Sequence, residues 1–140
     1  LGISLATLVT DQNQIQYILY RQKSFYEGQA SEKALRSVLK MDLDARHLYS
    51  ICFDQPILEK NWNCKVGKDG MVDLCKNEEK SLLIQWTERN EYKKRVILSN
   101  ADYEIQIVYK DYRTKVLDPS QNKSPFRIEV PEEFKRYKVY

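Results

Sequence analysis

No proline precedes Pro56, so nothing in the N-terminal part of this 140-residue chain forbids one long helix. From Ile15 onward, apolar residues recur at steps of three and four, the spacing of one face of an α-helix. A helix from the start of the chain to Lys40 would be roughly 60 Å long. A compact chain of this size is only about 37 Å across, so the end of the helix would project and need a partner. The apolar positions are Ile15, Ile18, Leu19, Phe25, Tyr26, Ala30, Ala34, Leu35 and Val38.

The beginning of the chain is uncharged. It starts with Leu1 rather than methionine, and Asp11 is its first charged residue. Residues 1–10 are too few to cross a bilayer, which takes about 20, but they match the end of a membrane helix. We therefore expect a processed or truncated chain whose residues 1–10 end a membrane or filament-core helix. The alternative is a break at Gly2 or near Asp11, with residues 1–10 forming a strand or a buried cap.

After residue 41, short runs of β-branched and aromatic residues replace the helical pattern. Asp69-Gly70 is a strong hairpin signal, and residues 103–110 alternate apolar with polar side chains, which predicts one buried face. The sequence thus predicts an α+β fold in which a long N-terminal helix, residues 1–40, packs on an antiparallel β-sheet meander, residues 41–140. The expected strands are Leu48–Phe53, Trp62–Val66, Met71–Cys75, Leu82–Thr87, Lys94–Leu98, Tyr103–Lys110 and Phe126–Val130.

Composition excludes several kinds of site. The four glycines do not have the spacing of a dinucleotide-binding fingerprint or of a P-loop. The single histidine, His47, excludes centres that need two imidazoles, and the three cysteines lack the spacing of a zinc site. The net charge of +3 is spread along the chain, which argues against a dedicated nucleic-acid module, because binding to phosphates needs clustered Lys and Arg. We expect a non-enzymatic domain without metal or cofactor, in which His47 forms structural hydrogen bonds. The other interpretation is a small hydrolase that pairs Cys52 or Cys75 with His47.

The cysteines suggest one covalent link. If Asp69-Gly70 is a two-residue turn, Cys64 and Cys75 face each other on neighbouring strands. In a hydrogen-bonded pair their α-carbons would lie about 5.5 Å apart, within the range of a disulfide. One hypothesis is a disulfide formed outside the cytoplasm, which leaves Cys52 free. The other is three reduced thiols that serve as small apolar side chains.

The segment Phe25-Tyr26-Glu27-Gly28-Gln29-Ala30-Ser31-Glu32-Lys33-Ala34-Leu35 is similar to a stretch in the helix of minor pilins and pseudopilins of type IV pili, including transformation and secretion pili. The resemblance covers about residues 1–40. It implies a bacterial subunit that crosses the cell membrane once before assembly and then joins an extracellular filament. The implied partners are other pilins and the membrane, with no small-molecule substrate. The implied packing residues are Leu1, Ile3, Leu5, Leu8, Val9, Ile15 and Ile18, and the motif residues are Phe25, Tyr26, Gln29, Ala30, Glu32 and Ala34.

Two further interpretations stay open. Lys135, Arg136 and Lys138 alternate with aromatic residues near the end of the chain and are candidate contacts to DNA, although a solvated tail is the simpler explanation. The alternative to a pilin is a soluble helix-plus-sheet binding module of the cystatin-like or NTF2-like type, for a small ligand or a protein partner. It predicts that residues 1–10 pack against the domain and that a pocket lies between helix and sheet.

Overall fold

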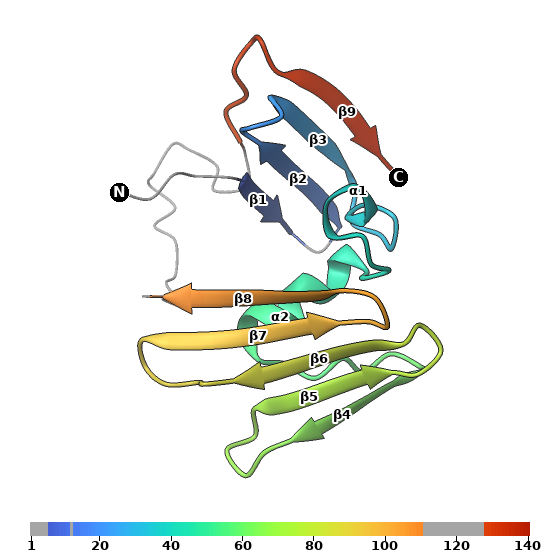
Figure 1. The fold of residues 1–140 in the computed structure, drawn as a ribbon, viewed down its shortest axis with the longest axis vertical. Helices are drawn as coiled ribbons and strands as arrows, with labels where there is room; N and C mark the ends of the chain where they lie inside the picture. The colour runs from blue at the N-terminus through green and yellow to red at the C-terminus, as the bar shows by residue number, and fades with distance from the viewer. Residues whose placement is uncertain (1–5, 12, 111–127) are drawn as a thin grey trace. The chain divides into compact units, whose positions relative to one another are not determined.

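The computed structural model describes residues 6–11, 13–110 and 128–140 (Figure 1). The chain forms two compact units. Unit 1 contains the described residues of Leu1–Ala34, Asp44–Arg46 and Val116–Tyr140, and unit 2 those of Leu35–Leu43 and His47–Lys115. Each unit has its own β-sheet.

Unit 1 is built on a four-stranded sheet of order β1-β2-β3-β9 (Figure 1). The first three strands form an antiparallel meander, whereas β9 runs parallel to β3. The β2–β3 hairpin turns at Lys23, which has a left-handed φ of 49° and donates its N–H to the carbonyl oxygen of Tyr20. The strands are β1 (Ala6–Thr10), β2 (Gln14–Leu19), β3 (Ser24–Gln29) and β9 (Lys135–Val139).

The predicted N-terminal helix over residues 1–40 is wrong, and so is the α+β fold class that rests on it. The described part of this segment forms β1, β2 and β3 and one short helix, α1 (Arg36–Leu39). Ile15 and Ile18, three residues apart, lie on opposite faces of β2, and both are buried, with exposed fractions of 1% and 0%. A strand covered on both faces therefore produced apolar spacing that imitates a helix face. The alternative of a strand before a break near Asp11 is correct for residues 6–10.

Unit 2 is built on a five-stranded antiparallel meander, β4-β5-β6-β7-β8. All five strands were predicted, and β4 and β6 have the predicted bounds. Along β6 and β7 every second side chain is buried, so one face of this sheet carries the core of the unit. The strands are β4 (Trp62–Val66), β5 (Val72–Asn77), β6 (Leu82–Thr87), β7 (Lys93–Ser99) and β8 (Glu104–Lys110).

Two other predicted strands are wrong. Leu48–Phe53 is the helix α2, entered through a 3-10 turn at Ala45–His47. Its Tyr49 and Phe53 rings, four residues apart, lie 4.7 Å from each other, as side chains on one helix face do. Of Phe126–Val130, the described residues 128–130 are not in a strand. No helix within the described ranges is long and apolar enough to cross a membrane.

Helix α2 covers the core face of the unit 2 sheet. The Trp86 indole N–H donates to the carbonyl oxygen of Ile51 at 3.2 Å, and the two side chains are 5% and 0% exposed. The helix ends at Asp54, whose left-handed φ of 56° lets its N–H bond to the Ser50 carbonyl, and Pro56 follows. The pocket predicted between a helix over residues 1–40 and the sheet depends on a helix that the described residues of this segment do not form.

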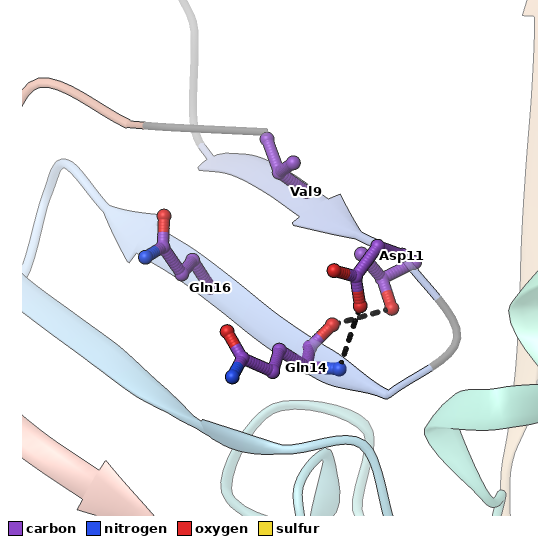
Figure 2. A pocket seen from close by; sticks show the side chains of 5 residues that line it. Val9, Asp11, Gln14 and Gln16 are labelled. Carbon is purple, nitrogen blue, oxygen red and sulfur yellow. Dashed lines mark hydrogen bonds between the residues drawn. The ribbon is translucent and has the colours of Figure 1, made fainter. Parts of the chain in front are cut away.

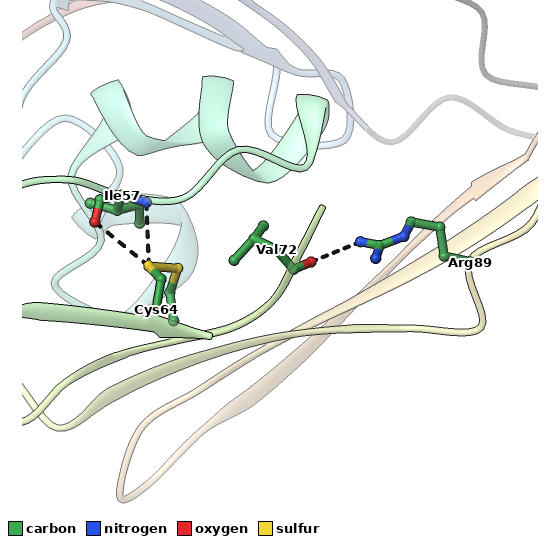
Figure 3. Close-up of a disulfide and its surroundings, with 5 residues drawn as sticks. Ile57, Cys64, Val72 and Arg89 are labelled. Atoms are coloured by element: carbon green, nitrogen blue, oxygen red, sulfur yellow. Dashed lines mark hydrogen bonds between the residues drawn. A yellow bond between two sulfur atoms is a disulfide. The ribbon is translucent and has the colours of Figure 1, made fainter. Parts of the chain in front are cut away.

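A disulfide joins Cys64 on β4 to Cys75 on β5 (Figure 3). The two residues face each other, as predicted, but their α-carbons are 4.0 Å apart, closer to the separation of a non-hydrogen-bonded pair than to 5.5 Å. The turn is also longer than predicted. Gly67 donates its N–H to the Met71 carbonyl across a loop that ends at Gly70, whose φ is 79°. An irregularity beside Val66 then restores the register that brings the two cysteines together.

Candidate functional site

The residues that the pilin resemblance assigned to filament packing do not form one stripe. Leu1, Ile3 and Leu5 lie outside the described residues. Leu8 and Val9 point to opposite faces of β1, with Leu8 43% exposed, while Ile15 and Ile18 belong to the core of unit 1. The predicted packing set is therefore divided between surface and core.

The residues of the predicted helix motif lie in a strand and in the connection after it. Phe25, Tyr26 and Gln29 belong to β3, and Ala30, Glu32 and Ala34 follow that strand. Ala34 is buried, and its carbonyl oxygen accepts a 3.0 Å hydrogen bond from the Tyr17 hydroxyl. The motif thus helps to build the interior of unit 1.

Three tyrosines form a stacked row across the sheet of unit 1. Tyr17, Tyr26 and Tyr137 are cross-strand neighbours on β2, β3 and β9. The first two rings lie 4.7 Å apart and the next two 5.0 Å apart, with interplanar angles of 14° and 20°. Tyr17 is 1% exposed and Tyr137 is 43% exposed, so the row runs from the core to the surface. Such pairs contribute about 1 kcal/mol each beyond burial, so the row holds β9 on the sheet.

The three basic residues predicted as DNA contacts lie on β9 but on two faces. Lys135 shares a face with Tyr137, whereas Arg136 and Lys138 lie on the other face, opposite β3 residues Phe25 and Glu27. The Arg136 guanidinium is 5.5 Å from the Phe25 ring, and the Lys138 ammonium is 2.5 Å from the Glu27 carboxylate. The alternation of a strand therefore divides charges that are adjacent in sequence.

The outer edge of β9 is open to pairing. Within the described residues, β9 has one neighbouring strand, β3, and is an edge of the sheet. The Lys135 N–H donates to the Lys23 carbonyl at 2.9 Å, so the Arg136 N–H, which alternates with it, points away from β3. On the side that faces β3, the two strands approach so closely that a Cβ on Gly28 would lie 1.8 Å from the Val139 carbonyl oxygen.

An amide-lined groove of about 310 Å³ lies on the face of the sheet that carries Lys138. Gln16 is partly engaged there, because its Oε1 accepts a hydrogen bond from the Ile128 N–H at 3.3 Å. The groove ends at the ion pair between Glu27 and Lys138, beside the edge strand. Its lining residues are Gln14, Ile15, Gln16, Glu27, Gly28, Gln29 and Lys138.

A smaller hollow beside the β1–β2 turn belongs to the turn itself (Figure 2). Its volume of about 30 Å³ suits a single water molecule. The Asp11 carboxylate accepts hydrogen bonds from the N–H groups of Gln14 and Asn13, at 2.8 and 3.0 Å, which lower the pKa of Asp11. This carboxylate holds the hairpin.

Among the described residues of unit 2, His47 is not paired with Cys52 or Cys75 as the hydrolase interpretation requires. Cys75 is in the disulfide, and the Cys52 sulfur lies 3.4 Å from the Tyr109 hydroxyl. His47 lies 3.1 Å from a Glu59 carboxylate oxygen, and its ring meets the Trp62 indole edge-on. Neither of its ring nitrogens forms a hydrogen bond with a described residue, so neither bonds to a cysteine. Across the described ranges, no three His, Cys, Asp or Glu side chains gather as a metal would need.

Comparisons with known protein families, with curated proteins and with solved structures give no match. The candidate site therefore rests on its own geometry. It consists of the open edge of β9 with Lys135, Arg136 and Lys138, the exposed end of the tyrosine row, and the amide-lined groove. Sequence analysis named the three cations, but β9 lies in the C-terminal segment that had no predicted secondary structure.

Proposed function

We propose that this protein is a binding module that receives an extended, acidic segment of a partner protein along the outer edge of β9. One observation carries the proposal: a five-residue edge strand, Lys135–Val139, holds three cations and outward-pointing backbone groups. Such an edge accepts a further strand through main-chain hydrogen bonds, and its side chains then select the sequence. The proposal keeps the binding-module alternative from the sequence and assigns it a protein partner.

Charge distinguishes β9 from the other described sheet edges. The edge strand β1 has no charged residue, β4 has one lysine, and β8 has a lysine and a glutamate. Cations on an edge strand repel basic strands and discourage self-association, whereas an acidic strand gains ion pairs with Lys135 and Arg136, because Lys138 is already paired with Glu27. The β9 edge therefore favours an acidic partner over an arbitrary extended segment.

The division of the cations between two faces favours a peptide over nucleic acid. Side chains of an added strand alternate between the faces of the sheet, so acidic residues on either face meet a cation of β9. Phosphate binding by DNA depends instead on Lys and Arg gathered into one patch. We therefore argue for the peptide and treat nucleic acid as an outcome of the test.

The disulfide indicates where such binding takes place. Disulfides form and persist in oxidising compartments such as the periplasm, the cell surface and the extracellular space. We propose that the partner is met outside the cytoplasm. The pilin proposal required a helix over residues 1–40 for assembly, and the strands in this segment leave it without that support.

The test uses the full chain and two synthetic peptides, one alternating glutamate with valine and one alternating lysine with valine. Amide shifts in NMR spectra and fluorescence anisotropy measure binding. We expect the acidic peptide to bind at residues 135–139. Its binding should weaken as the salt concentration rises, because the ion pairs are exposed. Lys135→Glu plus Arg136→Glu should lower its affinity about tenfold, equal to about 1.4 kcal/mol.

Three comparisons control the result. Lys65→Glu plus Lys68→Glu makes the same charge change in unit 2, at exposed positions, and should leave binding unchanged. Arg136→Gln removes only the cation, whereas Arg136→Pro also removes the outward N–H and should bind the peptide more weakly. Binding of a single-stranded oligonucleotide in place of the acidic peptide would overturn the proposal, as would equal affinity for both peptides.

A further inference from the structure

In unit 2, a further cavity is lined by six residues, four of which carry side-chain hydrogen-bond donors. Its volume is about 300 Å³, at the lower end of pockets that hold small molecules. Three cations and one carboxylate surround it, and the buried Met41, 4% exposed, lies among them. Its lining residues are Arg36, Lys40, Met41, Asp42, Lys80 and Asn100.

The only carboxylate of this cavity is already engaged. Asp42 Oδ1 accepts a 2.8 Å hydrogen bond from Arg36 Nε, and both side chains are about half exposed. This contact orients the guanidinium through one nitrogen. Among the described residues the two terminal nitrogens of Arg36 have no partner, and these form the fork that binds oxyanions in pairs.

Two further donors, Asn100 and Lys40, are also available. Asn100 Oδ1 accepts hydrogen bonds from the N–H groups of Asp102 and Tyr103, at 2.9 and 2.7 Å, which fixes the amide and leaves its NH₂ without a described partner. Lys40 follows α1 in a left-handed conformation, and its ammonium has no partner within the described ranges. Unpaired donors that come from separate segments and line one cavity are typical of an anion site.

We propose that this cavity binds the phosphate group of a small molecule or of a lipid headgroup, with Arg36 as the bidentate ligand and Lys40 and Asn100 as further donors. Phosphate fits because its oxygens accept from several donors at once and its charge offsets the excess of cations. The site is independent of the β9 edge, because all its residues belong to unit 2.

The test titrates the full chain, labelled with ¹⁵N, with inorganic phosphate, with glycerol 3-phosphate, and with vesicles of phosphatidylcholine with or without phosphatidylglycerol. We expect amide shifts around residues 36–42, 80 and 100 that weaken as sodium chloride rises. Binding of glycerol 3-phosphate in solution identifies a free ligand, whereas binding only to vesicles that contain phosphatidylglycerol identifies a lipid headgroup.

Lys40→Gln should lower the affinity for the bound probe about fivefold and Arg36→Gln at least tenfold. Lys40→Gln is the safer variant, because the lysine has no described partner to lose and the fold should be unaffected. Lys60→Gln, an exposed lysine elsewhere in unit 2, is the matched control and should bind normally. The proposal is overturned if none of the probes shifts these amides, or if Lys40→Gln and Arg36→Gln bind as tightly as Lys60→Gln.

Discussion

The ammonium group of Lys94 lies 3.1 Å from Asp54 Oδ1, and the lysine side chain is only 1% exposed. The same nitrogen donates to the Cys52 carbonyl at 2.6 Å, at the C-terminal end of α2, where it also offsets the negative end of the helix. This lysine joins the sheet of unit 2 to the helix that covers it. The neighbouring Lys93 pairs with Glu88 at 3.4 Å in a site that is about half exposed.

The contrast between Lys94 and Lys93 is directly measurable. Lys94→Ala leaves the Asp54 carboxylate, which is 12% exposed, without its nearest cation, and should lower the free energy of unfolding by about 3 kcal/mol. Lys93→Ala breaks an exposed pair and should cost less than about 1 kcal/mol. Urea denaturation of the two variants tests this, and equal losses would contradict the structural role of Lys94.

Gly28 should control the attachment of β9. A methyl group there would meet the Val139 carbonyl oxygen at 1.8 Å, so Gly28→Ala forces β9 away from β3. We expect faster hydrogen exchange of the amides of residues 135–139 and unchanged exchange in the strands of unit 2. The neighbouring Gln29→Ala, at an exposed position, is the control and should exchange as the natural protein does.

Tyr109 should make the protein less stable at alkaline pH. Burial, then the contact with Cys52, raises the pKa of this phenol above its usual value of 10.0. Above pH 10 the unfolded chain loses the Tyr109 proton while the folded chain keeps it, so the free energy of unfolding falls as the pH rises. Below pH 10 both states hold the proton and this effect is absent.

Guanidinium denaturation at pH 9 and pH 11 measures this effect. Tyr109→Phe has no phenol to ionise at this position, so its stability should fall less between the two pH values. The stability of Tyr92→Phe, a change at a position that is 71% exposed, should fall as much as that of the natural protein. A loss of equal size in all three proteins would show that Tyr109 is not responsible.

The disulfide should contribute a few kcal/mol. It closes a loop between residues 11 apart, and the chain-entropy model gives about 3 kcal/mol for a loop of this size. Cys64→Ala plus Cys75→Ala should lower the free energy of unfolding by about that amount, and reduction of the natural protein should have a similar effect. Cys52→Ala removes the exposed free thiol and should change stability by less than about 0.5 kcal/mol. Denaturation with and without reductant tests both expectations.

Some of this fold could be predicted because local signals agree with one another. In unit 2, alternating side chains identify β6 and β7, and the glycine turn at Gly70 places Cys64 opposite Cys75. That register was predicted with a two-residue turn. The real loop is one residue longer, and the irregularity beside Val66 compensates for it. The correct pairing therefore came from two local features that cancel.

The candidate site could be predicted only in part. Lys135, Arg136 and Lys138 were identified as a basic cluster, but their division between two faces depends on the pairing of β9 with β3. The residues that line the cavity of unit 2 were not identified at all, because Arg36, Lys80 and Asn100 are far apart in the sequence and meet only in the folded unit.

The sequence by itself determined the meander of unit 2, because alternation and turn residues act over a few neighbouring positions. Only the tertiary structure decided that residues 14–29 form strands, since spacings of three between apolar residues suit a helix face as well as a strand buried on both sides. It also decided that β9 lies beside β3. That pairing joins segments more than 100 residues apart and depends on the missing side chain of Gly28 and on the stacking of Tyr137 against Tyr26, contacts that exist only once both strands are in place.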